Sequence, residues 1–322
     1  MAYVKYILQK IDTDSCYNLS GFVVGAFFSL RLNPTSPLTV IIGNKQSTPE
    51  LQQQYTEQFD LDEPLLKQYI IWLKGIAHGD LGIDYVQKQP ILNQIIDRIP
   101  ITIGLVLFST ILGTVIAILI GVLAAMKRGT FIDYLIVGLS VLLISVPHLI
   151  FGLLLQKVFA GNLRWFPTIG WPEGKDLWFG GWKYTVLPTL TGCFSYIATY
   201  TRLLKTSMLD VVNQDYVLTA ESKGLSKSAI IRKHILRNSF IPVMTQLPMS
   251  VAMCITGSFF IESIFSIPGI GQYYVTAVNN QDLSIVLGEN SASVNSVYRC
   301  HLYYGYLICI CRSENPDARQ KK

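Results

Sequence analysis

The chain has 322 residues, of which 50% are hydrophobic and 15% are charged, and its formal net charge is +5. A soluble domain usually carries about 25% charged residues, so this composition argues against an ordinary soluble protein. The six cysteines show no paired metal-ligand spacing, which predicts neither a zinc site nor a disulfide framework.

The N-terminal segment, residues 1–33, starts with the basic residues Lys5 and Lys10. Basic residues near a membrane span favour the cytoplasmic side, so we expect a cytoplasmic N-terminus and a first span before residue 34. The only candidate, Gly21–Leu30, is a weak one because it has ten residues and follows a polar stretch. A signal peptide fits no better, since that polar stretch separates the basic start from the apolar run.

Residues 34–100 are predicted to form a small folded region outside the membrane. Within the stretch PLLKQYIIWLKGIA, apolar residues recur at helical spacing: Leu65, Leu66, Tyr69, Ile70 and Leu73. This pattern indicates an amphipathic helix and not a linker.

Three long apolar runs follow, namely Ile101–Met126, Tyr134–Leu155 and Phe240–Ile261, and Tyr184–Thr201 is a weaker fourth. A bilayer core requires roughly 20 apolar residues in a helix, and buried helices of soluble proteins seldom run so long without charge. We therefore predict an all-α polytopic membrane protein with about five to six transmembrane helices. Its core is expected at residues 101–287.

Basic residues concentrate in two connections between these runs. One carries Lys127 and Arg128, and residues 202–239 carry seven Lys or Arg against three acids. Short basic loops stay in the cytoplasm, so both connections are predicted there and residues 156–183 outside. This places the chain, multi-pass, in a cytoplasmic membrane of bacterial type.

The basic insert at residues 202–239 contains the sequence DYVLTAESKGLSKSAIIRKHILRN, starting at Asp215. Asp215 can cap a first helix, Gly224 stands where a helix end favours a left-handed residue, and Ser226 can cap a second helix. Two short helices are thus predicted, with Lys223, Gly224 and Leu225 at an exposed corner. A solvated helical loop is the plain alternative. A DNA-reading helix-turn-helix is disfavoured because the insert is tethered to spans at both ends.

The insert and several other segments resemble those of a known family. DYVLTAESKGLSKSAIIRKHILRNSFIP is similar to the cytoplasmic coupling segment of permease subunits in binding-protein-dependent ABC importers, in the branch that imports oligopeptides, dipeptides and nickel. TPELQQQYTEQFDLDEPLLKQYIIWLKGIAHGDLG with ILNQIIDRIPITIGL, SVPHLIFGLLL, LRWFPTIGW and GSFFIESIFSIPGIGQ also match that branch, in the expected order. The outer region resembles nickel-import permeases most.

The resemblance implies that the insert docks in a cleft of a cytoplasmic ATPase subunit. It also implies a second homologous permease subunit, two such ATPases and an extracytoplasmic solute-binding protein, with no cofactor in this chain and no nucleic acid. The coupling residues would be Ala220, Lys223, Gly224, Leu225 and Ser226. The general importer pattern has a Glu that is absent here, so the contact cannot be assigned to an acid. The chain has no phosphate-binding Gly-x-x-x-x-Gly-Lys-[Ser/Thr] loop, so ATP hydrolysis is expected in partner chains.

Two residues are candidates for the translocation path. Pro147 is predicted to bend the third span, because proline removes a backbone donor. Glu262 ends an uncharged run, and an ionisable group near membrane depth suggests function, although it could instead orient the following turn. The four histidines are scattered, so we expect no metal site, and His148 is interpreted as a packed residue.

The cargo is open between nickel and small peptides. The first choice is a permease for nickel or a nickel chelate, and the alternative is a dedicated oligopeptide or dipeptide permease. An intramembrane enzyme is disfavoured, since the chain has no His-Glu-x-x-His pair and no Gly-x-Ser-x-Gly elbow.

The C-terminal segment, residues 288–322, departs from what a sixth span requires. Its only apolar run, Leu302–Cys311, has ten residues and would cover about 15 Å as a helix. One hypothesis is an inactive version of a permease, with a short shifted reading frame near residues 12–20 and an uncorrected shift after about Gly288. The alternative is a functional chain with marginal spans supported by neighbouring helices.

Overall fold

The computed structural model describes residues 62–84, 87–172, 181–247 and 258–294, together with isolated positions before residue 62. The regular elements in these ranges are helices, with an isolated antiparallel bridge between Ile83 and Pro90. The all-α prediction is therefore confirmed for this part of the chain. The chain divides into two compact units, one of residues 1–100 and 269–322 and the other of residues 101–268.

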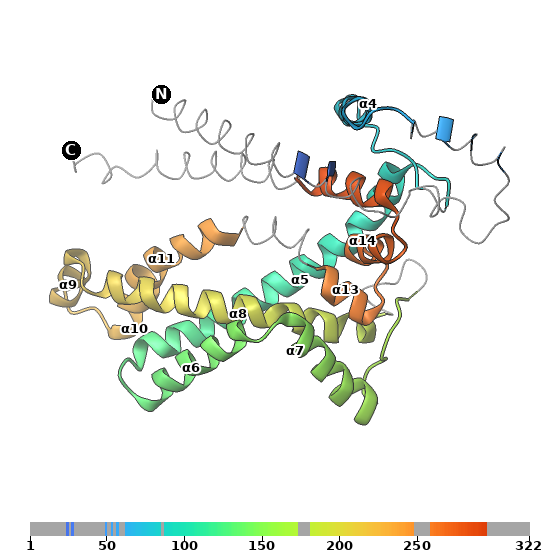
Figure 1. Ribbon diagram of the computed structural model, residues 1–322. Helices are drawn as coiled ribbons and strands as arrows, with labels where there is room; N and C mark the ends of the chain where they lie inside the picture. Colours follow the sequence, from blue (N-terminus) through green and yellow to red (C-terminus); the bar gives the residue numbers. More distant parts are fainter. Residues whose placement is uncertain are drawn as a thin grey trace, which may run out of the picture. The chain divides into compact units, whose positions relative to one another are not determined.

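The first unit contains helix α4 (Leu65–Ala77), the start of α5 (Ile91–Met126), α14 (Ile270–Asn279) and helical residues 283–294 (Figure 1). The predicted amphipathic helix is α4, which follows Pro64 and ends before Gly79, a left-handed glycine with φ +83°. The core of this unit is apolar and comprises Leu81, Ile91, Ile95, Ile270, Tyr273, Ala277, Ile285 and Val286.

The second unit is a helical bundle built along α8. Its helices are the remainder of α5, α6 (Phe131–Ser145), α7 (His148–Leu155), the π-helix η1 (Gln156–Asn162), α8 (Trp182–Val212), α9 (Asp215–Ser222), α10 (Lys227–Ile230), the π-helix η2 (Ile231–Ile235), α11 (Leu236–Ser239) and α13 (Phe259–Phe265). Helices α6, α7, α11 and α13 contact α8, and α9, α10 and α11 gather near the C-terminal end of α8 (Figure 1). This arrangement makes α8 the element that connects the insert to the rest of the bundle.

Helices α5 and α8 approach each other closely through glycines. A Cβ added at Gly113 would lie 2.7 Å from the Tyr196 Cβ, and one added at Gly192 would lie 2.7 Å from the Ser109 Oγ. The Cys193 Sγ donates to the Ser109 carbonyl at 3.3 Å. Small residues allow transmembrane helices to pack backbone against backbone, which explains the glycines inside these apolar runs.

Among the described helices, α5 alone is long and apolar enough to cross a membrane by itself. The pair Phe131–Ser145 and His148–Asn162 also qualifies if it is counted as one span, although it is bent by 99°. The predicted span Ile101–Met126 lies within α5, and Tyr184–Thr201 lies within α8. Most of the expected first span, part of Phe240–Ile261 and residues 295–322 fall outside the described residues.

Candidate functional site

The corner of the insert lies between α9 and α10. Gly224 has φ +74°, and its N–H donates to the Glu221 carbonyl at 2.9 Å. A Cβ added there would meet no atom within 4 Å, so glycine is required by the left-handed backbone and not by space. The prediction of a left-handed glycine ending the first helix is confirmed.

The two helices on either side of the corner, α9 and α10, have different N-caps. The Ser226 Oγ accepts a hydrogen bond from the Ala229 N–H at 3.4 Å, so its predicted role as the cap of the second helix is confirmed. The predicted cap Asp215 is wrong by one position, because Gln214 is the N-cap and Asp215 is the first residue of α9. A carboxylate in the first turn still interacts favourably with the helix dipole.

Four of the five predicted coupling residues are exposed: Lys223, Gly224, Leu225 and Ser226. Leu225 is 42% exposed, whereas Ala220 is only 4% exposed. Ala220 faces inward because it belongs to the turn of α9 that packs on the bundle. Ala220 therefore lies in the support beneath the corner, and its role in coupling stays a prediction.

That support is a shared apolar core, called the insert core below. It comprises Ala117, Tyr196, Tyr200, Leu204, Met208, Val217, Ala220, Ile230, Ile235 and Val243. Residues of α5 and α8 thus pack directly against residues of the insert. Each buried aliphatic side chain contributes about 1.5–3 kcal/mol of transfer free energy, so the corner is held firmly on the end of α8.

The second helix of the insert is apolar on its inner side, as predicted, but it is not a regular α-helix throughout. Its turn Ile231–Ile235 is a π-helix between α10 and α11. π-turns in proteins are frequent at functional positions. The Asn238 Nδ2 also donates to the Tyr216 hydroxyl at 2.9 Å, which links the two arms of the insert.

An open groove lies between the insert and the ends of α5 and α8. It is lined mainly by apolar side chains, with Glu221 and Lys227 as its charged residues: Ala125, Met126, Met208, Val212, Glu221, Lys227, Ile230, Ile231 and Ile235. The insert is therefore packed along one side and open along another.

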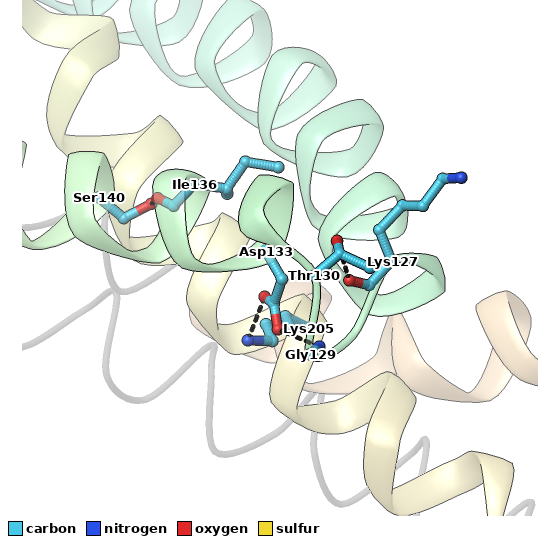
Figure 2. Close-up of polar contacts among 7 residues, drawn as sticks. All are labelled: Lys127, Gly129, Thr130, Asp133, Ile136, Ser140 and Lys205. Atoms are coloured by element: carbon cyan, nitrogen blue, oxygen red, sulfur yellow. Dashed lines mark hydrogen bonds and ion pairs between the residues drawn. The ribbon is translucent and has the colours of Figure 1, made fainter.

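A second connection to α8 comes from the turn between α5 and α6 (Figure 2). The Lys205 Nζ lies 2.5 Å from an oxygen of Asp133, a carboxylate that also accepts from the Gly129 N–H at 3.1 Å. Asp133 is 5% exposed, so this charge is paired inside the bundle. The pair ties the α5–α6 turn to the helix that carries the insert.

The ion pair was not predicted from the sequence. A signal was present, since Asp133 is the single acidic residue in residues 98–172. One carboxylate among apolar residues requires a partner, but nothing local pointed to Lys205.

Pro147 lies at the N-cap of α7, where its ring replaces the backbone donor and its ψ is 140°. Helices Phe131–Ser145 and His148–Asn162 meet there at 99°, so the predicted bend is confirmed. The role of Pro147 in the translocation path stays a prediction.

Glu262 is fully buried on α13. Its Oε1 accepts from the Thr102 hydroxyl at 2.8 Å and from the Ser258 hydroxyl at 2.7 Å. Its backbone carbonyl accepts from the Ile267 N–H at 2.9 Å. These contacts support the interpretation that Glu262 orients the turn after α13, and its role in the path stays a prediction. Its helix contacts the one that Pro147 caps, through Ile264 and Gly152.

Two parts of the chain match families of transport proteins. Residues 117–310 match the family described as binding-protein-dependent transport system inner membrane component, and residues 19–106 match the N-terminal part of the membrane component of such systems. The first match covers more than half of the chain.

Similar proteins of known name belong to peptide transport systems. The chain is 36% identical to the dipeptide transport system permease protein DppB of Bacillus subtilis, over 81% of this chain and 82% of that protein. It is 34% identical to the DppB protein of Lactococcus lactis and 33% identical to the oligopeptide transport system permease protein OppB of Haemophilus influenzae. Each of these two matches covers 88% of this chain and 90% of the relative.

Proposed function

This chain belongs to the family of binding-protein-dependent transport system inner membrane components, and we propose that it forms the translocation path of an importer for dipeptides or oligopeptides. It is a transport permease subunit of the ABC type, not an enzyme in itself. The single observation that supports a peptide cargo is the similarity of this chain, over more than four fifths of its length, to permeases named for peptides. The prediction of nickel as the first choice of cargo has no support from these relatives.

We propose that the corner Lys223–Ser226 is the contact with a cytoplasmic ATPase subunit. Support comes from three features that occur together: the corner is exposed, Gly224 allows its left-handed turn, and the insert core joins it to α8. When the ATPase pair closes, the corner would move with α8 as one body. The partners would be two ATPases, a second homologous permease subunit and an external solute-binding protein.

The proposed topology follows the basic loops. The N-terminus and the insert face the cytoplasm, and residues 34–100 lie outside. The predicted division into residues 1–33, 34–100, 101–287 and 288–322 is kept as part of this proposal, including the proposed break after Gly288. The described residues 283–294 form a continuous helix across this position. Gly288 itself packs closely there, because a Cβ added to it would lie 3.0 Å from the Leu81 carbonyl oxygen.

The cargo is tested by uptake in cells that lack the chain and receive it back on a plasmid. Labelled dipeptide, labelled oligopeptide and labelled nickel are compared under the same conditions. Restored uptake of either peptide, with nickel unchanged, is the expected result. Restored uptake of nickel alone would contradict the proposal, and restoration of none of the three would favour the inactive version.

The coupling contact is tested with Leu225→Asp. A charge on the exposed apolar side chain should abolish uptake and the solute-stimulated part of ATP hydrolysis by the assembled importer. Ser228→Asp is the matched control, since it adds the same charge in the first turn of α10, where an acid is favourable. Equal loss in both variants, or loss in neither at equal membrane abundance, would contradict a contact at the corner.

A further inference from the structure

Helix α4 presents an apolar stripe to its surroundings. Successive residues of an α-helix are rotated by about 100°, so Leu66, Ile70, Leu73 and Ala77 share one face. Leu66 is 66% exposed, and Ile70 and Leu73 are each 44% exposed. The opposite face packs inward in part: Gln68 is buried and Trp72 is half-buried, whereas Ile71 is 41% exposed.

The exposed stripe is too regular to be scattered surface residues. Single apolar side chains on a surface are normal, whereas a continuous apolar face marks contact with another apolar phase. In a region predicted to lie outside the membrane core, such a face on a 13-residue helix requires an occupant.

Lysines border the stripe on one side. Lys67 and Lys74 lie next to it on the helix surface, both exposed, and the Lys67 Nζ is 2.6 Å from Glu63. A helix with one apolar face bordered by lysines is suited to lie in the plane of a bilayer surface. Its lysine stems can follow the apolar phase while their ammonium groups reach the phosphates.

The inner face of α4 contacts residues expected to enter the bilayer. The Phe27 ring lies 5.2 Å from the Tyr69 ring and 5.3 Å from the Trp72 ring, centroid to centroid. Phe27 belongs to the apolar run predicted as the first span, and the family match at residues 19–106 includes both segments. Tyr and Trp are enriched where proteins cross the membrane–water boundary.

We propose that α4 is an interfacial helix whose stripe of Leu66, Ile70, Leu73 and Ala77 is buried among phospholipids at the boundary between headgroups and acyl chains. Lys67 and Lys74 bind the headgroup phosphates along its edge. The occupant of the apolar face is thus lipid, and the helix anchors the region between the first two spans to the bilayer surface.

The test uses the assembled importer in lipid nanodiscs, in a background without the native cysteines. A bimane fluorophore is attached to a single cysteine placed at Leu66, Ile70 or Leu73. Nanodiscs contain phospholipid with a nitroxide quencher near the headgroup or, separately, near the end of the acyl chain. Asp62→Cys, exposed and ahead of the helix, is the control position.

The expected result is that the shallow quencher acts on the three stripe positions at least about twofold more strongly than the deep quencher. The label at position 62 should be affected by neither. Quenching of the stripe labels no greater than at position 62 would overturn the proposal, and so would stronger quenching by the deep probe. Loss of the quenching when solute-binding protein is added would mean that the face binds protein, which also overturns it.

Discussion

Buried carboxylates occur in both units, but the units differ in how closely their long helices pack. In the first unit, buried carboxylates fix turns and helix starts: Asp84 accepts from the Gln87 N–H at 2.9 Å and from the Gln94 Nε2 at 3.1 Å, and Asp282 accepts from the Ile285 N–H at 3.2 Å. The second unit also has buried carboxylates, Asp133 and Glu262, but there glycines also let two long helices, α5 and α8, touch. Close contact through small residues is typical of helices in lipid.

Helix α5 shows this change within one element. Its first turns carry Asn93, Gln94, Asp97 and Arg98, and the Arg98 guanidinium lies 4.4 Å from the centre of the Tyr273 ring. From Ile101 to Met126 it carries no charge. A single continuous helix thus passes from side-chain polar contacts to close backbone packing.

The largest expected effect is overpacking of the α5–α8 contact by Gly113→Leu. The first added carbon alone would lie 2.7 Å from the Tyr196 Cβ and 3.1 Å from the Cys193 carbonyl oxygen. We expect a loss of more than about 3 kcal/mol in unfolding free energy, because backbone cannot move aside easily. The measurement is thermal unfolding of the purified importer, together with its yield.

Gly138→Leu is the matched control, because a Cβ added at Gly138 would meet nothing within 4 Å. It should unfold close to the parent temperature. If Gly113→Leu and Gly138→Leu unfold at the same temperature, then the glycine contact between α5 and α8 does not stabilise the second unit as proposed.

A second effect concerns the ion pair in that unit. Lys205→Met leaves the Asp133 carboxylate buried and unpaired, and the expected cost is about 3 kcal/mol. Asp133→Asn in the same chain should recover part of it, since the neutral amide has no buried charge. Thermal unfolding of the four chains of this double-mutant cycle measures the coupling, and a coupling near zero would mean that the pair does not join the α5–α6 turn to α8.

The local parts of the site could be predicted from the sequence. Gly224 and Ser226 follow from the chemistry of helix ends, which depends on neighbouring residues alone, and α4 follows from the helical spacing of its apolar residues. The identity of the helical insert required no knowledge of its tertiary contacts.

What the sequence could not supply are contacts between distant segments. The pairing of Asp133 with Lys205 and the burial of Ala220 depend on how α6, α8 and α9 pack, and helical periodicity does not choose between partners. Pro147 predicted a bend, but the angle of 99° depends on the packing of α7 against α8 and α13.

A third prediction returns to the first unit. Asp84→Leu removes the acceptor of the Gln94 amide and of the Gln87 N–H, and leaving these donors without that acceptor should cost about 2 kcal/mol. Hydrogen exchange of residues 84–95 should accelerate, while exchange in α8 should be unchanged. Asp62→Leu, at an exposed position, should change stability by less than about 0.5 kcal/mol.

An equal effect of Asp84→Leu and Asp62→Leu would contradict the view that buried carboxylates organise the first unit. Faster exchange in α8 as well would mean that the two units unfold together.

The smallest expected effect tests the insert, where the second unit uses the same kind of bond as the first. Ser226 caps α10 through the Ala229 N–H much as Asp282 holds the Ile285 N–H, but Ser226 is exposed and its bond is 3.4 Å long. Ser226→Ala should therefore cost only about 1 kcal/mol, seen as faster exchange confined to residues 226–231, and uptake should fall modestly because the corner is less well ordered. Ser228→Ala removes a hydroxyl from the first turn of the same helix without removing a cap, so its exchange and uptake should match the parent. If Ser226→Ala also matches the parent, the Ser226 cap contributes no stability and the corner depends on the turn at Gly224 and on the insert core alone. The Ser226 and Asp282 bonds would then be alike in geometry but not in their contribution to stability.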